Sequence, residues 1–566
     1  MNDDIVRGTA VFYYLFNHIC LPFEIGEISG MEFGRRSHRM VCIVVAGLLF
    51  LSSASSVAAN QFVPAIGSTF ITFFGGSNFE DATKVAFDND GNTILIGQTQ
   101  SDNLNTTDNA FQPDEGGGDW DAFIAKFNPM GELAFCSYLG GTDYEHITSV
   151  NVDVDNNIVV AGTTASTGLP TTPGALHETL IGSTDGFVFV IAPNGTILYG
   201  TYFGGAQEDW IYGMEFDDSG NLLFSGWTNS IGLATSGVYQ TAYAGGGADA
   251  FVARLSADCS TLQMFTYIGG AGDDRAWSMT IDDSDDYIIS GVAGAGFPIT
   301  AGAYQSSHGG LSDAYLTKVS YAGDSLNFST YLGGIANDLG LGVDVDSQGN
   351  IILTGDTESD DITTLNAVQG TFAGGTNDFF ASKFNATGYP SFVTYIGGNA
   401  TDRCWDARVD ADDNLVLVGR TSSVDFPAFA GMNNTKSGGF DACVTMLSSD
   451  GQTIYASTFI GGDGEDIGEG IAVNSLGDIV VTGRTWSANF PVSEGAQQEE
   501  IGGLSDVFVC HAPFYNRTLP PTASWTTTSP TPSGYPTLDT TTILILAATG
   551  GIVAVIVLAV LLVYKK

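Results

Sequence analysis

The sequence predicts an all-β protein, a seven-bladed β-propeller of four-stranded antiparallel blades, on three observations. An aromatic residue, an apolar residue and two glycines recur every 64 or 65 residues, beginning at Phe73, Tyr138, Tyr202, Tyr267, Tyr331, Tyr395 and Phe459. Between these marks apolar residues alternate with a period of two, as in DAFVARL, and helical spacing never persists over three turns. The array also begins with one isolated strand and ends one strand short. Such copies cannot bury their apolar faces alone, so they must stack in an array or a ring.

Within one copy the landmarks predict four strands in order. A carboxylate four residues after the second glycine opens the first strand, and a turn such as DNDGN at 88–92 leads to the second. Asp, Asn and Gly suit this hairpin because they accept positive φ and bond their own backbone. The second strand is an apolar run that ends in a glycine such as Gly97. After a longer loop, Asp121 opens the third strand, and the fourth returns to the next Gly-Gly pair.

The two ends of the array predict a closed ring. Residues 67–76 resemble a fourth strand without the three that should precede it, and residues 506–512 resemble a third strand with none after it. We therefore expect the first segment to complete the last blade. An open solenoid would need polar caps, which neither end of the array shows. A closed ring of four-stranded units is a β-propeller, and seven blades lie within the usual range.

The landmarks also match a known repeat. The pattern YLGG-xxx-D, VDxxGN, GxT, FPTTxGAxQ and DAFVxK is carried by TYLGGIANDLGLGVDVDSQGNIILTGDT (330–357) and GAYQSSHGGLSDAYLTKVS (302–320). Over about residues 67–512 the chain thus resembles the SBBP-type β-propeller repeat family. That resemblance implies an extracytoplasmic propeller, but no shared reaction and no catalytic residues. The FP element is retained at 297–298, 426–427 and 490–491, becomes Leu169–Pro170, and is lost near residue 365.

The segments that flank the predicted propeller, residues 60–515, indicate export. Arg35, Arg36 and Arg39 precede an apolar run, and small residues follow up to Ala59, which is the order of a secretory signal. We expect a leader over 1–59 that contains a signal peptide at 31–59, cleaved after Ala59, with translation starting at Met31 or Met40. The alternative is a genuine N-terminal extension in which residues 41–51 act as a membrane anchor.

The C-terminal segments indicate a tether. Residues 516–540 are rich in Thr, Ser and Pro and predict an extended stalk. Residues 541–566 predict a transmembrane anchor, because the apolar stretch 543–564 is long enough to cross roughly 30 Å of hydrocarbon. Lys565 and Lys566 should then lie in the cytoplasm and the propeller on the extracellular face of the cell membrane. Seven Asn-x-Ser/Thr sequons, the first at Asn105, agree with a glycoprotein at that location.

The charge of the chain excludes one class of partner. With 18 basic and 63 acidic residues the formal net charge is −45. Nucleic acids and anionic lipid surfaces demand a positive surface, so neither is expected. The charge favours cations, basic proteins or a saline habitat, and we interpret it first as a device for solubility and habitat. Five cysteines remain after the predicted cleavage; because their number is odd and they do not follow the repeat, no disulfide framework is expected, although isolated bridges stay open.

An acidic ring raises a calcium hypothesis. The carboxylates that open the first strands would surround the mouth of a central channel, where they could bind Ca²⁺ or a cationic ligand. The alternative, which we favour, is that each bonds backbone amides of its Gly-Gly turn, since one site would not need seven copies. The same choice applies to the DNDGN loop, which resembles a calcium loop without its bidentate Glu. The seven residues are Glu80, Glu145, Asp209, Asp274, Asp338, Asp402 and Asp466.

Residues that break the repeat are the candidate ligand-binding residues. The position after each acidic residue is different in nearly every copy, and His146, Trp210, Arg275 and Arg403 there could form a polar and aromatic cluster at the channel mouth, suited to a sugar or peptide. The alternative is an ordinary variable surface. Trp120, Trp405 and Trp486 are expected to be partly buried packing residues. The long loops share the mouth's face, and loops on a rigid scaffold commonly carry function.

No catalytic motif is recognised: GxSxG, HExxH and phosphate loops are absent, and the histidines lack metal-ligand spacing. No catalytic residue or cofactor is therefore assigned. We expect a binding or interaction module for an extracellular protein or glycan. The alternatives are an extracellular carbohydrate-active enzyme, with carboxylates such as Glu208 and Asp273, or a structural component of the cell envelope.

Overall fold

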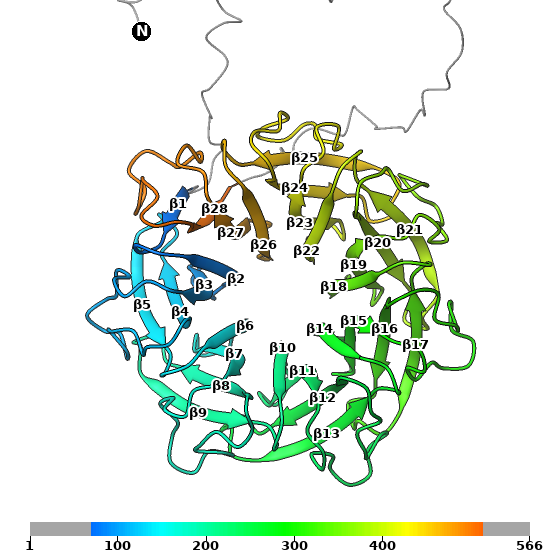
Figure 1. The fold of residues 1–566 in the computed structure, drawn as a ribbon, viewed down its shortest axis with the longest axis horizontal. Helices are drawn as coiled ribbons and strands as arrows, with labels where there is room; N and C mark the ends of the chain where they lie inside the picture. The colour runs from blue at the N-terminus through cyan, green and yellow to red at the C-terminus, as the bar shows by residue number, and fades with distance from the viewer. Residues whose placement is uncertain (1–69, 513–566) are drawn as a thin grey trace, which may run out of the picture. The chain divides into compact units, whose positions relative to one another are not determined.

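The computed structural model describes residues 70–512, and within that range every regular element is a β-strand. The strands form seven sheets of four antiparallel strands each. Figure 1 shows the sheets arranged radially around one centre, which confirms the predicted seven-bladed propeller. The described residues contain no helix long and apolar enough to span a membrane. The predicted leader, stalk and transmembrane anchor lie outside them.

The strands of each blade follow the chain outward from the centre (Figure 1). The innermost strands are β2 (Glu80–Phe87), β6 (Glu145–Val152), β10 (Asp209–Phe216), β14 (Arg275–Ile281), β18 (Asp338–Val345), β22 (Asp402–Val409) and β26 (Asp466–Val473). The second strands are β3 (Thr93–Thr99), β7 (Ile158–Thr164), β11 (Leu222–Thr228), β15 (Tyr287–Ala293), β19 (Ile351–Thr357), β23 (Leu415–Thr421) and β27 (Ile479–Thr485).

The remaining strands complete the blades. The third strands are β4 (Asp121–Phe127), β8 (Asp185–Ile191), β12 (Asp249–Leu255), β16 (Asp313–Val319), β20 (Asp378–Phe384), β24 (Asp441–Leu447) and β28 (Asp506–His511). The outermost strands are β5 (Leu133–Leu139), β9 (Ile197–Phe203), β13 (Leu262–Ile268), β17 (Leu326–Leu332), β21 (Pro390–Ile396), β25 (Ile454–Ile460) and, for the last blade, β1 (Phe70–Phe74).

The ring is closed by the first strand of the described chain, as predicted. β1 pairs antiparallel with β28, with Phe70 opposite His511 and Phe73 opposite Phe508, so the last sheet has the order β1-β28-β27-β26. The loop before β28 also contacts β1, because the backbone amide of Phe73 donates to the carbonyl of Gln498 at 3.2 Å. Neither end of the array is therefore left as an open sheet edge.

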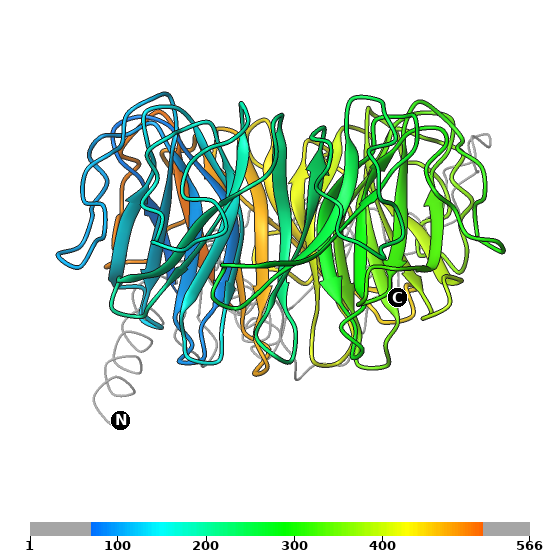
Figure 2. The same cartoon turned by 90° about the horizontal axis from the view of Figure 1, so that it is seen from below.

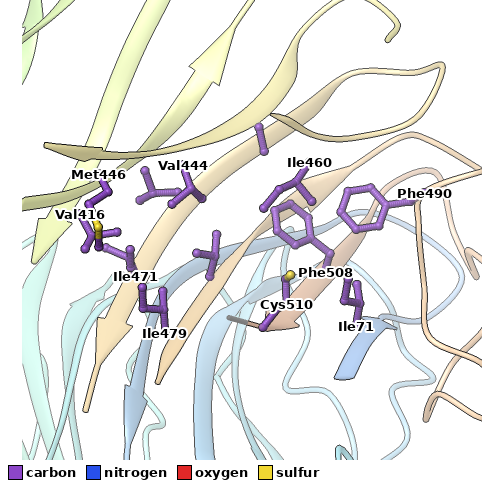
Figure 3. Packing of buried hydrophobic residues seen from close by; sticks show 14 of the residues in the cluster. Ile71, Val416, Val444, Met446, Ile460, Ile471, Ile479, Phe490, Phe508 and Cys510 are labelled. Atoms are coloured by element: carbon purple, nitrogen blue, oxygen red, sulfur yellow. The ribbon is translucent and has the colours of Figure 1, made fainter. Parts of the chain in front are cut away.

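Apolar side chains from neighbouring blades interdigitate to form the core. Around the closing strand, Ile71 of β1 belongs to one buried cluster with Phe490 and with Phe508 and Cys510 of β28 (Figure 3). The same cluster continues into the preceding blade through Val444 of β24. All five cysteines in the described residues are buried and free, so neither a framework of disulfides nor an isolated bridge joins them.

The hairpin turns between the first and second strands have the backbone that their composition predicts. The fourth residue of each turn has positive φ in all seven blades: Gly91, Asn156, Gly220, Asp285, Gly349, Asp413 and Gly477. In the first turn the Asp88 carboxylate accepts the amides of Asp90 at 2.9 Å and Asn92 at 2.8 Å, and the Lys126 ammonium lies 2.6 Å away. Asp88 therefore stabilises a turn, and its oxygens are occupied without a metal ion.

The two faces of the ring carry different connections. The short turns, such as 88–92 and 128–132, lie at one end of the strands; the Gly-Gly links and the longer loops, such as 100–120, lie at the other. Figure 2 shows the strands running between these two faces. We call them the turn face and the loop face.

Candidate binding site at the mouth of the central channel

The innermost strands surround the centre of the ring in Figure 1, and their side chains line two cavities there. The cavity nearer the loop face, here called the mouth cavity, has a volume of about 450 Å³. The cavity nearer the turn face, here called the lower cavity, has a volume of about 650 Å³. Lys84, Tyr212 and Trp277 line both cavities, so they lie where the two meet.

A β-bulge in each innermost strand increases the number of side chains that reach the channel. In β2 the pairing with β3 shifts between Ala82 and Lys84, and the other six innermost strands carry the same irregularity. A bulge interrupts strict alternation, so two successive residues can point to one side. Accordingly Thr83 and Lys84 both line the mouth cavity, together with Asp81 and Ala82 before them.

Three of the four predicted binding residues meet in the mouth cavity. His146 from β6, Arg275 from β14 and Arg403 from β22 all line it. Trp210 is not among its lining residues but lies against them. Its ring stacks on Tyr212 with the ring centroids 6.1 Å apart. The His146 ring meets it edge-on, with the two ring centroids 5.9 Å apart. Burial lowers the pKa of His146, so its imidazole is neutral at physiological pH.

The two predicted arginines are held by a carboxylate and an aromatic ring each. Arg275 donates from Nε and Nη2 to Asp273 at 3.2 and 3.1 Å, and its guanidinium lies 4.7 Å from the Trp227 ring centroid. Arg403 donates from Nε to Asp356 at 2.6 Å. These contacts restrict the arginine side chains before any ligand arrives, which lowers the entropy cost of binding.

Several residues of the site were not predicted from the sequence. Trp405, expected only to pack, lines the mouth cavity, with the Arg403 guanidinium 4.9 Å from its ring centroid. Arg484 also lines it, and Arg420 lies 5.1 Å from the Trp405 ring. Both arginines come from second strands, where Arg420 is opposite Arg403 and Arg484 is opposite Ile467. Comparing the copies at this second-strand position, which also shows no constant residue, would have found them.

Trp486 contacts the second-strand Arg484, whose guanidinium lies 5.3 Å from the centroid of the Trp486 ring. Arg484 itself forms an ion pair with Asp81 at 3.0 Å and approaches Glu469 at 3.5 Å. Burial, with the negative charge of Asp81, raises the pKa of Glu469 well above its ordinary value. The mouth cavity therefore contains a carboxyl group that resists ionisation beside a paired guanidinium.

The seven acidic residues of the predicted ring face into the blades. All seven side chains are buried. Each accepts the backbone amide of the second glycine of its turn, at 2.7 to 2.9 Å. Most also accept a hydroxyl from the end of the second strand; Asp209, for example, accepts Thr228 and Ser230, whereas Asp274 accepts the Gly294 amide instead. These carboxylates therefore hold the turn to the second strand of their own blade.

This environment does not fit a calcium ion. Ca²⁺ takes six to eight oxygen ligands, usually from several carboxylates and carbonyls together. In six of the seven residues both carboxylate oxygens already accept amides or hydroxyls within one blade. In Asp402 one oxygen does so, whereas Oδ1 is buried without a hydrogen-bond partner among the described residues. Between residues 70 and 512 no three His, Cys, Asp or Glu side chains gather as a metal site would require.

A network of charges around the buried Asp406 lies at the lower cavity. Lys84 of the first blade reaches Asp406 of the sixth at 2.7 Å, and Arg408 pairs with the same carboxylate at 2.9 Å. Lys84 passes the intervening blade at Gly470, where an added Cβ would lie 3.0 Å from the Lys84 Cα. Glu215 accepts from the Asn151 amide at 2.9 Å, and burial raises its pKa to about 7. The network ties non-adjacent blades together beneath the mouth cavity.

Comparison with known proteins finds only distant similarity. No protein-family model matches the chain. The regulatory protein FlaEY of Caulobacter vibrioides is 26% identical over 236 residues, which are 39% of this chain and 24% of that protein. The chain thus spans about a quarter of the length of this curated relative.

Several solved structures align with this chain at low similarity. The Neurospora crassa Pan2 WD40 domain is 9% identical, with 80% of this chain and 100% of that chain covered and a TM-score of 0.37. A polysaccharide lyase of family PL25, an ulvan lyase, is 12% identical over 78% of this chain and 97% of that chain, with a TM-score of 0.39. A mutant of the NanB sialidase of Streptococcus pneumoniae is 8% identical over 81% and 72%, with a TM-score of 0.36. None of these similarities is close enough to indicate a function.

Proposed function

We propose that this chain is a cell-surface binding module whose ligand site is the mouth cavity and whose ligand is an extracellular glycan or protein. One observation carries the proposal. The first-strand positions at which the seven copies differ supply a cavity of about 450 Å³, within the usual range of small-molecule sites. The repeated residues build the blades, whereas packing does not require His146, Arg275 and Arg403 at positions that other blades fill with Leu or Ile.

The chemistry of the mouth cavity supports this proposal. Its side chains combine aromatic rings with guanidinium groups, as at Trp405 and Arg403. Trp, Tyr and Arg are enriched at the residues that dominate binding energy in interfaces, because they supply large rigid surfaces and directed hydrogen bonds. A sugar ring could lie with its C–H groups against an indole face while its hydroxyls accept from the arginines.

The experiment compares wild-type protein with two site variants and one control variant. Glycan arrays and cell-surface pull-downs with wild type should identify a ligand, and Trp405→Ala should reduce its binding at least ten-fold. Arg403→Gln gives a second measurement that leaves the aromatic surface in place. Val154→Ala is the control, because Val154 is 94% exposed in a turn-face hairpin and should leave binding unchanged. A ligand that binds all four proteins equally would show that the mouth cavity is not its site.

The location of the propeller is part of the proposal. We propose that the repeat is of the SBBP type, which would agree with an extracytoplasmic domain, and that a C-terminal membrane segment at 543–564 tethers it. N-terminal sequencing should find Asn60 as the first residue of the mature protein. Protease treatment of intact cells should release the propeller; a mature protein that starts at Met1 and resists the protease would contradict both expectations.

A second candidate function, cleavage of a polysaccharide, has one observation in its favour. The raised pKa of Glu469 beside Asp81 would suit a carboxylic acid that donates a proton in the mouth cavity. Of the carboxylates named from the sequence, Asp273 instead pairs with Arg275. A screen of the purified protein against polysaccharides tests this function. Turnover should be lost in Glu469→Gln, and its absence in the wild type would remove the candidate.

A further inference from the structure

The basic residues of this acidic protein are concentrated at its channel. Residues 70–512 contain eleven Lys and Arg residues. Five serve elsewhere: for example, Lys126 and Lys383 pair with turn carboxylates at 2.6 and 2.9 Å. The other six line the two cavities or contact a residue that does: Lys84, Arg275, Arg403, Arg408, Arg420 and Arg484. In a chain of net charge −45, the channel therefore gathers six of the eleven basic residues of the described range, together with the carboxylates that pair with five of them.

Arg420 differs from the other five cations because it has no counter-ion. Lys84, Arg275, Arg403, Arg408 and Arg484 each form an ion pair. Among the described residues, Arg420 has neither an ion-pair partner nor a hydrogen-bond acceptor, and its Nε is buried without a partner. Its guanidinium is held between two rings, 4.3 Å from the Phe440 centroid and 5.1 Å from the Trp405 centroid.

The surroundings of Arg420 are unfavourable for a cation without a ligand. It lies directly opposite Arg403 on the paired strands β22 and β23, and like charges facing each other across strands are destabilising. Burial, followed by the positive charges of Arg403 and Arg484, lowers the pKa of Arg420, and the opposite effect of the nearby Glu465 and Glu469 is smaller. Such an arrangement lowers the stability of the folded protein. An anion bound beside Arg420 would offset its repulsion from Arg403 and accept hydrogen bonds from its guanidinium.

We infer that Arg420, with Arg403 and Arg484, forms an anion-binding subsite, and that the ligand of the mouth cavity is an acidic saccharide carrying a carboxylate or sulfate group. This inference rests on the proposed function of the mouth cavity. The planar guanidinium matches the geometry of carboxylate and sulfate oxygens and can donate two parallel hydrogen bonds. The Trp405 face provides the apolar surface on which a sugar ring can pack.

The charge of the remaining surface narrows the ligand further. Exposed carboxylates repel a polyanion within a Debye length of about 8 Å at physiological ionic strength. A long acidic polymer lying across the ring would meet that repulsion along its length, whereas a terminal unit that enters the mouth cavity would reach Arg403 and Arg484 in its lining. A volume of about 450 Å³ also suits a short saccharide. The subsite therefore favours one or two acidic sugar units at a chain end.

Calorimetric titration of the full-length protein with matched pairs of probes tests the inference. Methyl β-glucuronide is compared with methyl β-glucoside, and galactose 6-sulfate with galactose. At least one acidic sugar should bind ten-fold or more tightly than its neutral partner, with an affinity that falls as salt rises. Inorganic sulfate and an oligoglutamate peptide distinguish other sources of the same negative charge. If either binds as tightly as the acidic sugar, the assignment to a saccharide is overturned.

Variants then assign the preference to the subsite. Arg420→Gln should reduce the affinity for the acidic sugar at least ten-fold while changing that for its neutral partner less than two-fold. Arg254→Gln is the matched control, because Arg254 also stacks on a ring, 3.9 Å from the Tyr321 centroid, but lies on an outer part of its blade. If Arg420→Gln does not fold, Arg420→Lys retains the charge without the planar fork and should still lose several-fold in affinity.

The possible failures are distinguishable. If neutral and acidic sugars bind equally and Trp405→Ala removes both, the subsite is overturned and the proposed function stands. If an acidic sugar binds but neither Trp405→Ala nor Arg420→Gln alters its affinity, the mouth cavity is not the site and both are overturned.

Discussion

Replacing Phe73 with alanine should weaken the closure of the ring by about 3–5 kcal/mol. The Phe73 side chain is fully buried in β1, and its ring centroid lies 5.9 Å from that of Phe490. Truncation removes the transfer free energy of the ring and leaves a cavity, since the surrounding blade can collapse only in part; large-to-small changes of this kind cost about 3–5 kcal/mol. The loss should appear at the junction of β1 with β28, which no covalent link supports.

Urea unfolding of residues 60–515, followed by tryptophan fluorescence, measures this loss, and two other variants calibrate it. Phe459 occupies the equivalent position in β25, whose blade is covalently continuous, and it is 2% exposed. Phe459→Ala should therefore cost a similar amount. Ile335→Ala, at a side chain that is 66% exposed, should stay within about 0.5 kcal/mol of wild type.

Because β1 lies at one end of the described chain, Phe73→Ala could also release this strand before the rest of the ring unfolds. Hydrogen exchange of the β28 amides measures that local opening directly, and the variant should exchange faster there. The reasoning would be refuted if Phe73→Ala cost less than about 1 kcal/mol while β28 exchanged as in wild type. The pairing of β1 with β28 would then not be what holds the ring closed.

Three further predictions concern the blades and their buried acids. Asp209→Ala should cost about 2–4 kcal/mol in chemical unfolding, because the Gly205 amide and two hydroxyls lose their acceptor; a change at an exposed acid, Asp218→Ala, should be neutral. Tyr202→Phe should cost about 1 kcal/mol in the same assay, since the hydroxyl donates to the Ser166 carbonyl at 2.9 Å, and an unchanged stability would contradict that role. Thermal stability should fall as pH rises from about 4.5 to 7, because burial raises the pKa of Glu215 from 4.5 to about 7. The folded state binds this proton more tightly, so the stabilisation is complete below pH 4.5 and is lost as pH passes 7. Glu215→Gln should flatten that part of the melting-temperature profile, and an unchanged slope would exclude Glu215 as its source.

The fold could be predicted closely because its signals are local and repeated. A turn such as 88–92 needs a residue that tolerates positive φ, and Gly91 has φ of 79° where the fifth-blade turn uses Gly349 at 74°. Seven concordant copies make each such inference more secure than it would be in a unique segment. The closing strand could be predicted for the same reason, since 67–76 matches the fourth strand of every other copy.

The candidate site could be predicted only in part. His146, Arg275 and Arg403 were identified because they break the pattern of the innermost strands, and they do line one cavity. The pattern of the innermost strands does not identify Arg420 and Arg484, because both come from second strands, where the hydrophobic periodicity indicates only apolar runs. Trp405 was assigned to packing because a half-buried tryptophan on a strand has the same local pattern whether it faces a core or a channel.

The repeat, the strands, the turns and the closure of the ring can be inferred without a structure, because each depends on residues within one copy or on a comparison of copies. Which unlike side chains contact one another depends on the assembled ring. Positions separated by one or more repeats converge at the centre of the ring, where Lys84 of the first blade reaches Asp406 of the sixth. Such contacts depend on channel radius, side-chain length and the bulge in each inner strand, and hydrophobic periodicity contains none of these. The unpaired guanidinium of Arg420 is likewise a property of the assembled ring.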